Sequence, residues 1–434
     1  MESQTSDFKG TKRFGIPLKI LHRLSDCLPY IMQEHFIPTQ VPTMDFSFTE
    51  EQTQIRELTR QILADNCGDD FHMAYRKSQV KDTQVRYAKD IWKMMADSGL
   101  LGTAVPESFG GSGFGLIELC QMLEEQGRHV APIPLLPALV YGGLTLATFG
   151  SKTQQQKFLP GLASGNLLLT AAIAEESMSP AIRAKCSATE VSGKWQLNGL
   201  RVAVPYAEES AAILVCATTI SSNKTGKAIF IVEPQKAVSC EFTHSGNHEP
   251  LYSVTFKNAE AELLGSIEQG ESVLNFIVNN GAIACAATMI GITEESMRRT
   301  ALFTAERKQF ETTIASFQNT TMKMADCYID VESLRSSYYE AMWKLSEASV
   351  HNTNVCDADV KVAKYWSSIA GHRVTHTCQH LHGGIGSDVE YPLHRYYLWF
   401  KQMDLTLGGG SKQLADLGAL IAKDSSINLL KNLA

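Results

Sequence analysis

Closely spaced cysteine pairs are absent from this 434-residue chain. Its ten cysteines occur singly, mostly within apolar stretches, and none belongs to a CxxC motif. A disulfide framework or a structural zinc site needs paired or clustered ligands. Free thiols in a reducing compartment are therefore the better interpretation, and we predict a cytoplasmic protein.

A metal-binding histidine motif is also missing. Twelve histidines are present, and four of them cluster late in the chain, at His372, His376, His380 and His382. These four lack the companion ligands that a motif such as HExxH supplies. The sequence therefore predicts no metal site.

Long basic runs and long apolar runs do not occur. The formal net charge is −7 and no basic tract stands out, which argues against nucleic acid as a partner. We find no run of about 18 uncharged apolar residues and expect no membrane-spanning helix. With 44% hydrophobic residues, the chain is long enough for two or three domains with sizeable cores.

The first part of the chain divides into an extension and a helical region. Residues 1–43 mix basic residues with short apolar pieces and lack the long apolar segment of a signal peptide. We interpret them as an extension upstream of a domain that starts at Met44, with a genuine surface arm as the alternative. A capping box from Thr49 to Gln52 then opens an all-helical domain over 44–165.

Strand patterns follow over residues 166–262. Short apolar runs bounded by turn residues predict strands, and Ser192-Gly193 between two of them predicts a hairpin. The expected strands are 167–173, 186–191, 194–197, 212–216, 228–232 and 251–256. We predict a middle β domain, either a small barrel or a sandwich.

Proline is absent between Pro250 and Pro392, and this interval carries long helical patterns. Gly281 and Gly291 lie inside the first pattern, and each costs about 1 kcal/mol in a helix interior. Both glycines therefore need a reason, such as close helix packing or the approach of a ligand. The expected helices are 272–307, 320–352, 357–380 and 413–422. They predict a four-helix bundle over 263–434 and an α+β protein overall.

Five motifs, taken together and in order, resemble the acyl-CoA dehydrogenase family, and the resemblance covers the chain from Met44 to its C-terminus. The motifs are Met44-Asp45-Phe46-Ser47-Phe48-Thr49-Glu50-Glu51-Gln52, Val105-Pro106-Glu107-Ser108-Phe109-Gly110-Gly111-Ser112-Gly113 with Leu123-Glu124-Glu125-Gln126-Gly127 after it, Phe158-Leu159-Pro160-Gly161-Leu162-Ala163-Ser164-Gly165, Glu306-Arg307-Lys308-Gln309-Phe310 and Leu381-His382-Gly383-Gly384-Ile385-Gly386. The resemblance implies FAD as cofactor. It also implies a glutamate that removes the α-proton of an acyl-CoA while the flavin accepts the β-hydride.

The resemblance also implies that each FAD lies between two subunits. Arg307 matches an arginine that reaches the pyrophosphate of the neighbour's FAD, where a guanidinium fork suits phosphate. Phe310 matches an aromatic residue packed near the same cofactor, and Gln318 matches a glutamine that faces the nucleotide. The alternatives are a solvated surface cation, core packing and a plain surface glutamine.

The glycine-rich segment after the third long helix matches another part of the cofactor site. Gly383, Gly384 and Gly386 would let the backbone approach a ligand, and a helix C-cap with a turn is the alternative. Gln379 or His380 would supply the polar contact that the family places here.

The family's catalytic glutamate has no counterpart in this sequence. Gly408 occupies its usual position, and the alternative position on the first long helix falls at Asn280-Gly281-Ala282. The nearest acids in sequence are Asp404 and Glu390, which we interpret as structural or surface carboxylates. We therefore predict no catalytic residue in this chain.

The flavin-ring contacts of the β domain also depart from the family pattern. The loop that touches the ring reads Ala174-Glu175-Glu176-Ser177-Met178-Ser179-Pro180, and the strand that carries the stacking tryptophan and a threonine reads Arg201-Val202-Ala203-Val204-Pro205-Tyr206. Pro205 also lacks an N–H group. The half of the site that serves the chain's own flavin is therefore altered, whereas the half that serves a neighbour's FAD is kept.

This asymmetry predicts an obligate heteromer, an α2β2 tetramer with a homologous catalytic subunit that holds most of the acyl-CoA. The segment Tyr391-Pro392-Leu393-His394-Arg395-Tyr396-Tyr397-Leu398-Trp399, with the glycine-rich segment before it, is similar to the non-catalytic subunits of steroid-degrading members. That resemblance implies a bulky, steroid-derived acyl group. An active homotetramer with a displaced base and a flavin-free structural subunit are the alternatives.

Overall fold

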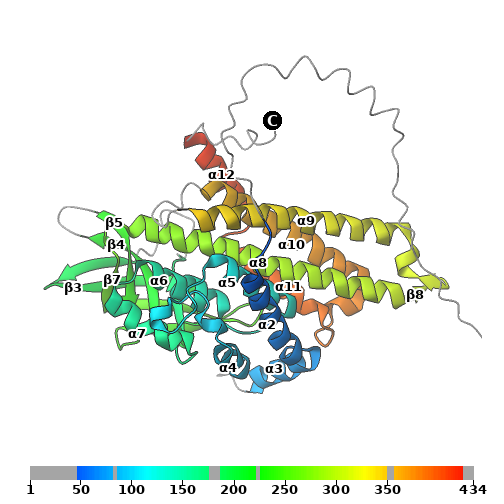
Figure 1. Cartoon of the computed structure of the whole chain (residues 1–434). Coiled ribbons are helices and arrows are strands. Elements are labelled where there is room, and N and C mark those ends of the chain that lie inside the picture. The colour runs from blue at the N-terminus through cyan, green and yellow to red at the C-terminus, as the bar shows by residue number, and fades with distance from the viewer. Residues whose placement is uncertain (1–45, 82–85, 175–185, 221–224, 349–355, 424–434) are drawn as a thin grey trace, which may run out of the picture. The chain divides into compact units, whose positions relative to one another are not determined.

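The computed structural model describes residues 46–81, 86–174, 186–220, 225–348 and 356–423. The predicted extension over 1–43 and most of the loop after Ala174 that was predicted to contact a flavin lie outside the described residues. The described elements follow the predicted order of helices, strands and helices, which confirms the expected fold class (Figure 1). The division into domains with the predicted boundaries stays a prediction.

Apolar residues recur along the N-terminal helices, and the side chains of Thr49 and Ser151 cap the starts of two of them. The side chain of Thr49 accepts from the Gln52 amide at 3.2 Å, and Gln52 accepts in return from the Thr49 amide, which confirms the predicted capping box. Pro160 lies inside a helix, near its C-terminal end. The elements are α2 (Glu50–Asn66), α3 (Asp69–Lys81), α4 (Lys89–Asp97), α5 (Leu116–His129), the π-helix η4 (Leu136–Leu144), α6 (Thr145–Phe149) and α7 (Lys152–Ala163).

The strands form a closed barrel. From β4 the hydrogen bonding passes through β2, β3, β7 and β5 and then returns to β4, while β1 and β6 pair at the side. Apolar side chains such as Phe230, Val254 and Phe256 fill its interior. The predicted hairpin turn is present, with positive φ at Ser192 and Gly193. The strands are β1 (Leu169–Ala172), β2 (Ser187–Val191), β3 (Lys194–Pro205), β4 (Ala212–Ile220), β5 (Thr225–Val232), β6 (Val238–His244) and β7 (Pro250–Leu264).

The C-terminal helices pack around α8. In Figure 1 the strands lie at the start of α8, and the small hairpin that includes β8 lies at its far end. Helices α9, α10 and α11 pack against α8, and α12 packs against α10. The elements are α8 (Gly270–Glu306), β8 (Lys308–Gln309), β9 (Thr312–Thr313), α9 (Gln318–Glu347), α10 (Asp357–His382), α11 (Leu393–Leu405) and α12 (Gly410–Lys423).

By length and composition alone, helix α8 could cross a membrane. No such helix was expected from the sequence. The most apolar stretch of α8 is 83% buried inside the protein. Its apolar residues are therefore accounted for by contacts with the helices and strands around it, as in the central helix of a packed core.

The two interior glycines of α8, Gly281 and Gly291, have packing reasons. A Cβ at Gly291 would lie 1.9 Å from the Glu124 carbonyl oxygen, and a Cβ at Gly127 would lie 2.0 Å from the Thr288 oxygen. Helices α5 and α8 therefore meet backbone to backbone. A Cβ at Gly281 would lie 2.5 Å from the ring of Tyr141, so Gly281 makes room for an aromatic side chain of η4.

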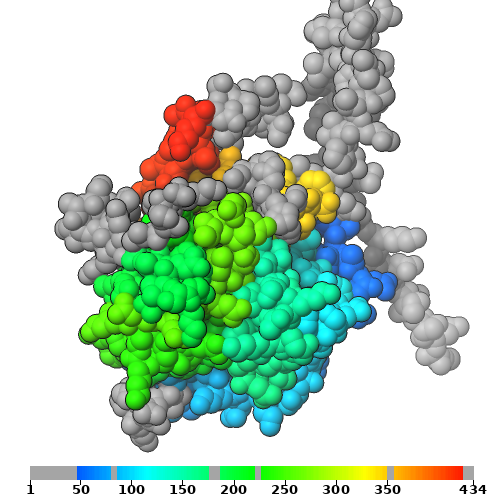
Figure 2. Space-filling model, turned by 90° about the vertical axis from the view of Figure 1, so that its left-hand side faces the viewer, coloured from blue at the N-terminus to red at the C-terminus, as the bar shows by residue number. Residues whose placement is uncertain are grey.

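A buried ionic network joins the helices on this side of α8. Glu125 is fully buried and accepts hydrogen bonds from Arg56, Arg60 and Arg128, at 3.0–3.2 Å. Arg128 also pairs with Glu294 of α8. The network therefore crosses from α2 through α5 to α8. In the view of Figure 2 the N-terminal helices (cyan) lie directly beside the β strands (green).

Candidate functional site

The C-terminal end of α8 carries three of the predicted cofactor residues. Arg307 is the C-cap residue of α8, and its carbonyl accepts a hydrogen bond from Ile314 at 2.9 Å. This bond closes a hairpin of β8 and β9 whose two turn residues, Phe310 and Glu311, both have positive φ. Gln318 is the first residue of α9. One short connection between two long helices thus brings the three residues together.

All three side chains face outward in the single chain. Phe310 is 91% exposed, and its ring contacts Phe317 edge to face, with 6.5 Å between the centroids. Arg307 and Gln318 are exposed too. Among the described residues, the Arg307 guanidinium makes no ion pair. An exposed large aromatic beside an unpaired guanidinium is typical of a surface that another molecule covers.

The glycine-rich turn after α10 satisfies several requirements within the chain itself. Gly383 caps α10 with φ +66, and a Cβ at Gly386 would lie 2.6 Å from the Gln379 carbonyl oxygen. The Gln379 side chain folds back and donates to the Ser387 hydroxyl at 2.9 Å. A Cβ at Gly384 would meet nothing within 4 Å. The C-cap alternative thus accounts for Gly383 and Gly386, and a role toward a cofactor stays a proposal.

The ends of α8, α9 and α10 converge, so the two predicted segments are neighbours. Phe303 of α8 stacks on His382 of α10 with 4.2 Å between ring centroids. Lys323 of α9 lies 3.1 Å from the Nδ1 atom of His380. His382 is buried and its Nε2 atom has no partner among the described residues. Burial lowers the pKa of His382, which keeps this ring neutral beside Phe303.

The chain's own cleft lies elsewhere, where η4, the barrel and the end of α11 meet. It encloses about 260 Å³ and is mostly apolar. Pockets that hold drug-sized ligands enclose roughly 300–1,000 Å³. Its walls include Tyr141, Ile173, Ala203, Pro205 and Leu407, and the Tyr141 ring and Leu407 close over Gly281.

The strand predicted to carry altered flavin contacts forms one wall of this cleft. The pairing of β3 with β7 is interrupted between Arg201 and Val204, and Ala203 has φ +51. Positive φ at a residue other than glycine is strained by about 1–3 kcal/mol. The Pro205 carbonyl accepts from the Thr170 hydroxyl at 2.7 Å. This wall therefore offers alanine and proline side chains on a bulged strand.

The turn at Gly408 is held by buried side chains although it carries no acid. Gln413 is 5% exposed and donates to the carbonyls of Leu407 and Gly408 at 2.9 and 3.1 Å. The fully buried Lys364 donates to the carbonyls of Met403 and Asp404, at 2.8 and 3.1 Å, at the end of α11. Gly408 itself has φ +93. The turn is therefore fixed through its backbone.

A carboxylate from the barrel enters the cleft, and no local pattern in the sequence indicates it. Glu249 lies just before β7 and is the acidic residue among those that line the cleft. Asn247 donates to its Oε2 atom at 3.0 Å, and burial raises the pKa of Glu249. Of the acids that the sequence suggested, Glu390 is exposed, and Asp404 lies near Gly409 at the end of α11.

Comparison with known proteins agrees with this architecture. Residues 49–166 match the family model "Acyl-CoA dehydrogenase, N-terminal domain", and residues 268–421 match "Acyl-CoA dehydrogenase, C-terminal domain". The chain is 32% identical to "Acyl-CoA dehydrogenase FadE27" of Mycobacterium tuberculosis over 387 residues, which cover 88% of this chain and 99% of that protein.

Two solved structures are similar over nearly the whole chain. The first is a variant of the "Tcur3481-Tcur3483 steroid ACAD", with 35% identity, a TM-score of 0.78 and coverage of 87% of this chain and 99% of that one. The second is the ChsE4-ChsE5 complex from Mycobacterium tuberculosis, with 31% identity, a TM-score of 0.80 and coverage of 88% and 100%. The helical, barrel and helical regions thus define an acyl-CoA dehydrogenase fold. This chain belongs to the acyl-CoA dehydrogenase family.

Proposed function

We propose that this chain is the non-catalytic subunit of a heterotetrameric, FAD-dependent acyl-CoA dehydrogenase. In this assembly Arg307, Phe310, Gln318, Gln379, His380 and the glycine turn at 383–386 hold the nucleotide half of an FAD whose ring lies in a homologous catalytic subunit. FAD supplies the hydride acceptor for α,β-desaturation of an acyl-CoA. The residues of this chain would bind and orient its phosphates.

One observation carries the proposal, namely the distance between the two halves of the site. Gly281 packs against the wall of the chain's own cleft, and α8 ends 25 residues later at Glu306. At 1.5 Å per helical residue, these positions are about 38 Å apart. Arg307 therefore cannot reach a cofactor bound in its own cleft, and its unpaired guanidinium suits the phosphate of another subunit's cofactor.

The composition of the exposed set fits a dinucleotide. The guanidinium of Arg307 can donate two parallel hydrogen bonds to a phosphate. The exposed Phe310 ring offers an apolar face for an aromatic base. Gly384 has open space at its Cβ position, so its backbone can be approached closely.

The cleft within this chain supports the proposal that the chain is non-catalytic. Its volume of about 260 Å³ is small for a flavin ring together with an acyl chain. Gly408 provides no carboxylate at the turn. The substrate is proposed to be a bulky steroid-derived acyl-CoA, because one similar solved structure is titled a steroid ACAD. The catalytic subunit would bind most of it.

Co-expression with a homologous subunit that carries the catalytic glutamate tests the proposal. We expect the isolated chain to be colourless or inactive on acyl-CoAs. We expect the purified complex to be yellow, active and to contain fewer FAD molecules than subunits. A yellow, active homotetramer of this chain alone would overturn the proposal, and a complex without flavin absorbance would favour a structural subunit.

Glu249 gives specific support to a second candidate, an active enzyme with a displaced base. This carboxylate reaches the cleft from the barrel, as a displaced base would have to. The isolated chain would then dehydrogenate an acyl-CoA when supplied with FAD, and Glu249→Gln would abolish that activity. The matched variant Glu390→Gln, at an exposed loop position, would leave it unchanged.

A further inference from the structure

Two thiols meet across the interface of α9 and α10, away from the cleft. Cys327 of α9 and Cys378 of α10 belong to a small buried cluster with Val331, Val374 and Leu393. Each of the two thiols shifts the pKa of the other, so they lie within interaction range. Both cysteines are free. The two helices are thus brought together around a dithiol.

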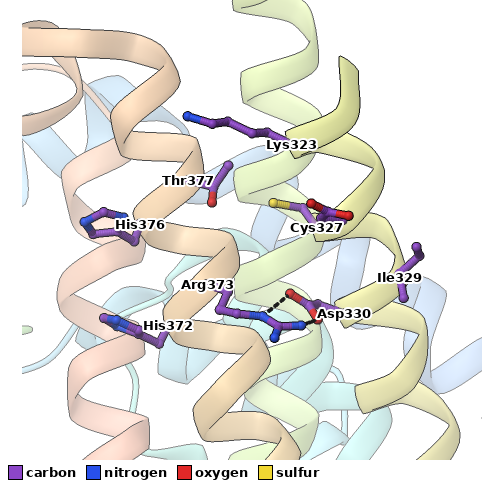
Figure 3. Close-up of a pocket in the computed structure, with 9 residues that line it drawn as sticks. Lys323, Cys327, Ile329, Asp330, His372, Arg373, His376 and Thr377 are labelled. Carbon is purple, nitrogen blue, oxygen red and sulfur yellow. Dashed lines mark hydrogen bonds and ion pairs between the residues drawn. The ribbon is translucent and has the colours of Figure 1, made fainter. Parts of the chain in front are cut away.

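An open groove leads to one of the two sulfur atoms. It encloses about 520 Å³ between α9 and α10, and Cys327 is among the residues that line it. Figure 3 shows the sulfur of Cys327 directed toward α10, with Thr377 beside it. Arg373 spans the groove and pairs with Asp330 at 2.7 Å (Figure 3). A small reagent that enters the groove therefore meets Cys327 before it meets Cys378.

The surroundings distinguish the two thiols chemically. The neighbouring Cys378 thiol is the largest cause that lowers the pKa of Cys327; burial opposes it, and Thr377 and Arg373 lower the pKa further. The pKa of Cys378 is raised, first by its interaction with Cys327, which favours the protonated thiol, and then by burial. A thiolate is the form of cysteine that attacks an oxidant. Cys327 is thus the attacking thiol and Cys378 the resolving one.

We propose that Cys327 and Cys378 form an oxidation site that a peroxide converts into a disulfide between α9 and α10. The Cys327 thiolate attacks one peroxide oxygen, the O–O bond breaks, and a sulfenic acid and one water are formed. The Cys378 sulfur then attacks Cys327, the S–O bond breaks, and a second water leaves. Two thiols lose two electrons and two protons in total, and one hydrogen peroxide is reduced to two waters.

The position of the cross-link would connect it to the cofactor residues. Cys378 immediately precedes Gln379 and His380, and Lys323 contacts His380 from the same helix that carries Cys327. A disulfide here would fix the end of α10 against the start of α9. This consequence rests on the proposed function, whereas formation of the disulfide does not.

Peroxide treatment of the full chain, alone or in its complex, tests the site. After alkylation of the remaining thiols, peptide mass spectrometry should find a peptide pair linked through Cys327 and Cys378, lighter by two hydrogens. Cys327→Ser and Cys378→Ser should each lose the linked pair. In Cys378→Ser, a dimedone probe should trap Cys327 as the sulfenic acid. If peroxide leaves both thiols reduced in the folded wild-type protein, the proposal is overturned.

Cys285 provides the matched control. It lies in α8 and is fully buried, and burial raises its pKa to about 11. Cys285→Ser should leave the linked pair unchanged. An alkylation time course on the wild-type protein keeps the test decisive if a serine variant does not fold. Cys327 should react faster than Cys285, and equal rates would contradict the assigned roles.

Discussion

Removal of the Arg307 side chain should weaken FAD binding by the complex and leave folding intact. The guanidinium is exposed and unpaired among the described residues, so Arg307→Ala should change the free energy of unfolding by less than about 0.5 kcal/mol. Hydrogen bonds to a charged phosphate contribute about 1.5–3 kcal/mol. Since about 1.4 kcal/mol corresponds to a factor of ten, the dissociation constant of FAD should rise about tenfold to a hundredfold.

The measurement is an FAD titration of the flavin-free complex, followed by flavin fluorescence, together with thermal unfolding of the same samples. Arg307→Lys keeps the charge but loses the planar fork, so it should fall between the wild type and Arg307→Ala. Lys93→Ala, at an exposed position of α4, serves as the charge-matched control and should bind FAD normally.

Two results would refute this reasoning. An unchanged dissociation constant for Arg307→Ala would show that the guanidinium does not hold the nucleotide. A large loss of thermal stability without FAD would show that Arg307 supports the fold. The prediction therefore separates a binding role from a structural one.

Three further predictions concern packing, pH and the altered turn. Gly291→Ala should lower the free energy of unfolding in urea by about 3 kcal/mol, because the new Cβ would meet the backbone of α5. The control Gly418→Ala should leave this free energy unchanged, because a Cβ at Gly418 would meet nothing within 4 Å. The pKa of His72 is lowered from 6.5 to about 4, mainly by burial. The folded state therefore resists protonation, and about 3 kcal/mol of the free energy of unfolding should be lost as the pH falls from 6.5 to about 4. His72→Gln should flatten the plot of unfolding free energy against pH. Gly408→Glu should lower the free energy of unfolding by about 1–3 kcal/mol, because Gly408 has φ +93. The same variant should give the isolated chain no dehydrogenase activity in a dye-reduction assay, because Pro205 and the small cleft remain.

The long helices and the hairpin could be predicted because their signals are local. The apolar pattern of α8 and the Ser192-Gly193 turn both predict a structure without knowledge of any partner element. Helix α11 was not predicted, because its aromatic and charged residues form no clear apolar stripe in the sequence. Its buried face is defined only by its contacts with α8 and α10. Strand β6 was missed because it pairs with β7 at the side of the barrel and alternates weakly.

The candidate site divides in the same way. Arg307, Phe310 and Gln318 lie within twelve residues, so a motif could identify them together. Glu249 is far in sequence from the other residues of the cleft, and only the closure of the barrel brings it there. The distance of about 38 Å between the cleft and the end of α8 likewise follows only once α8 is known to be one uninterrupted helix.

Gln413 holds the turn at Gly408, and Lys364 holds the end of α11 just before it. Both side chains donate only to backbone carbonyl groups. Carbonyl groups are common to every amino acid, so these hydrogen bonds do not require a particular side chain in the turn, although the φ of +93 at Gly408 favours glycine there. The hydrogen bonds that hold this backbone can therefore be kept when the displayed side chain changes. Under the proposed function, loss of the glutamate at this turn would leave its carbonyl hydrogen bonds in place, and with them the surface that the turn offers to a partner subunit.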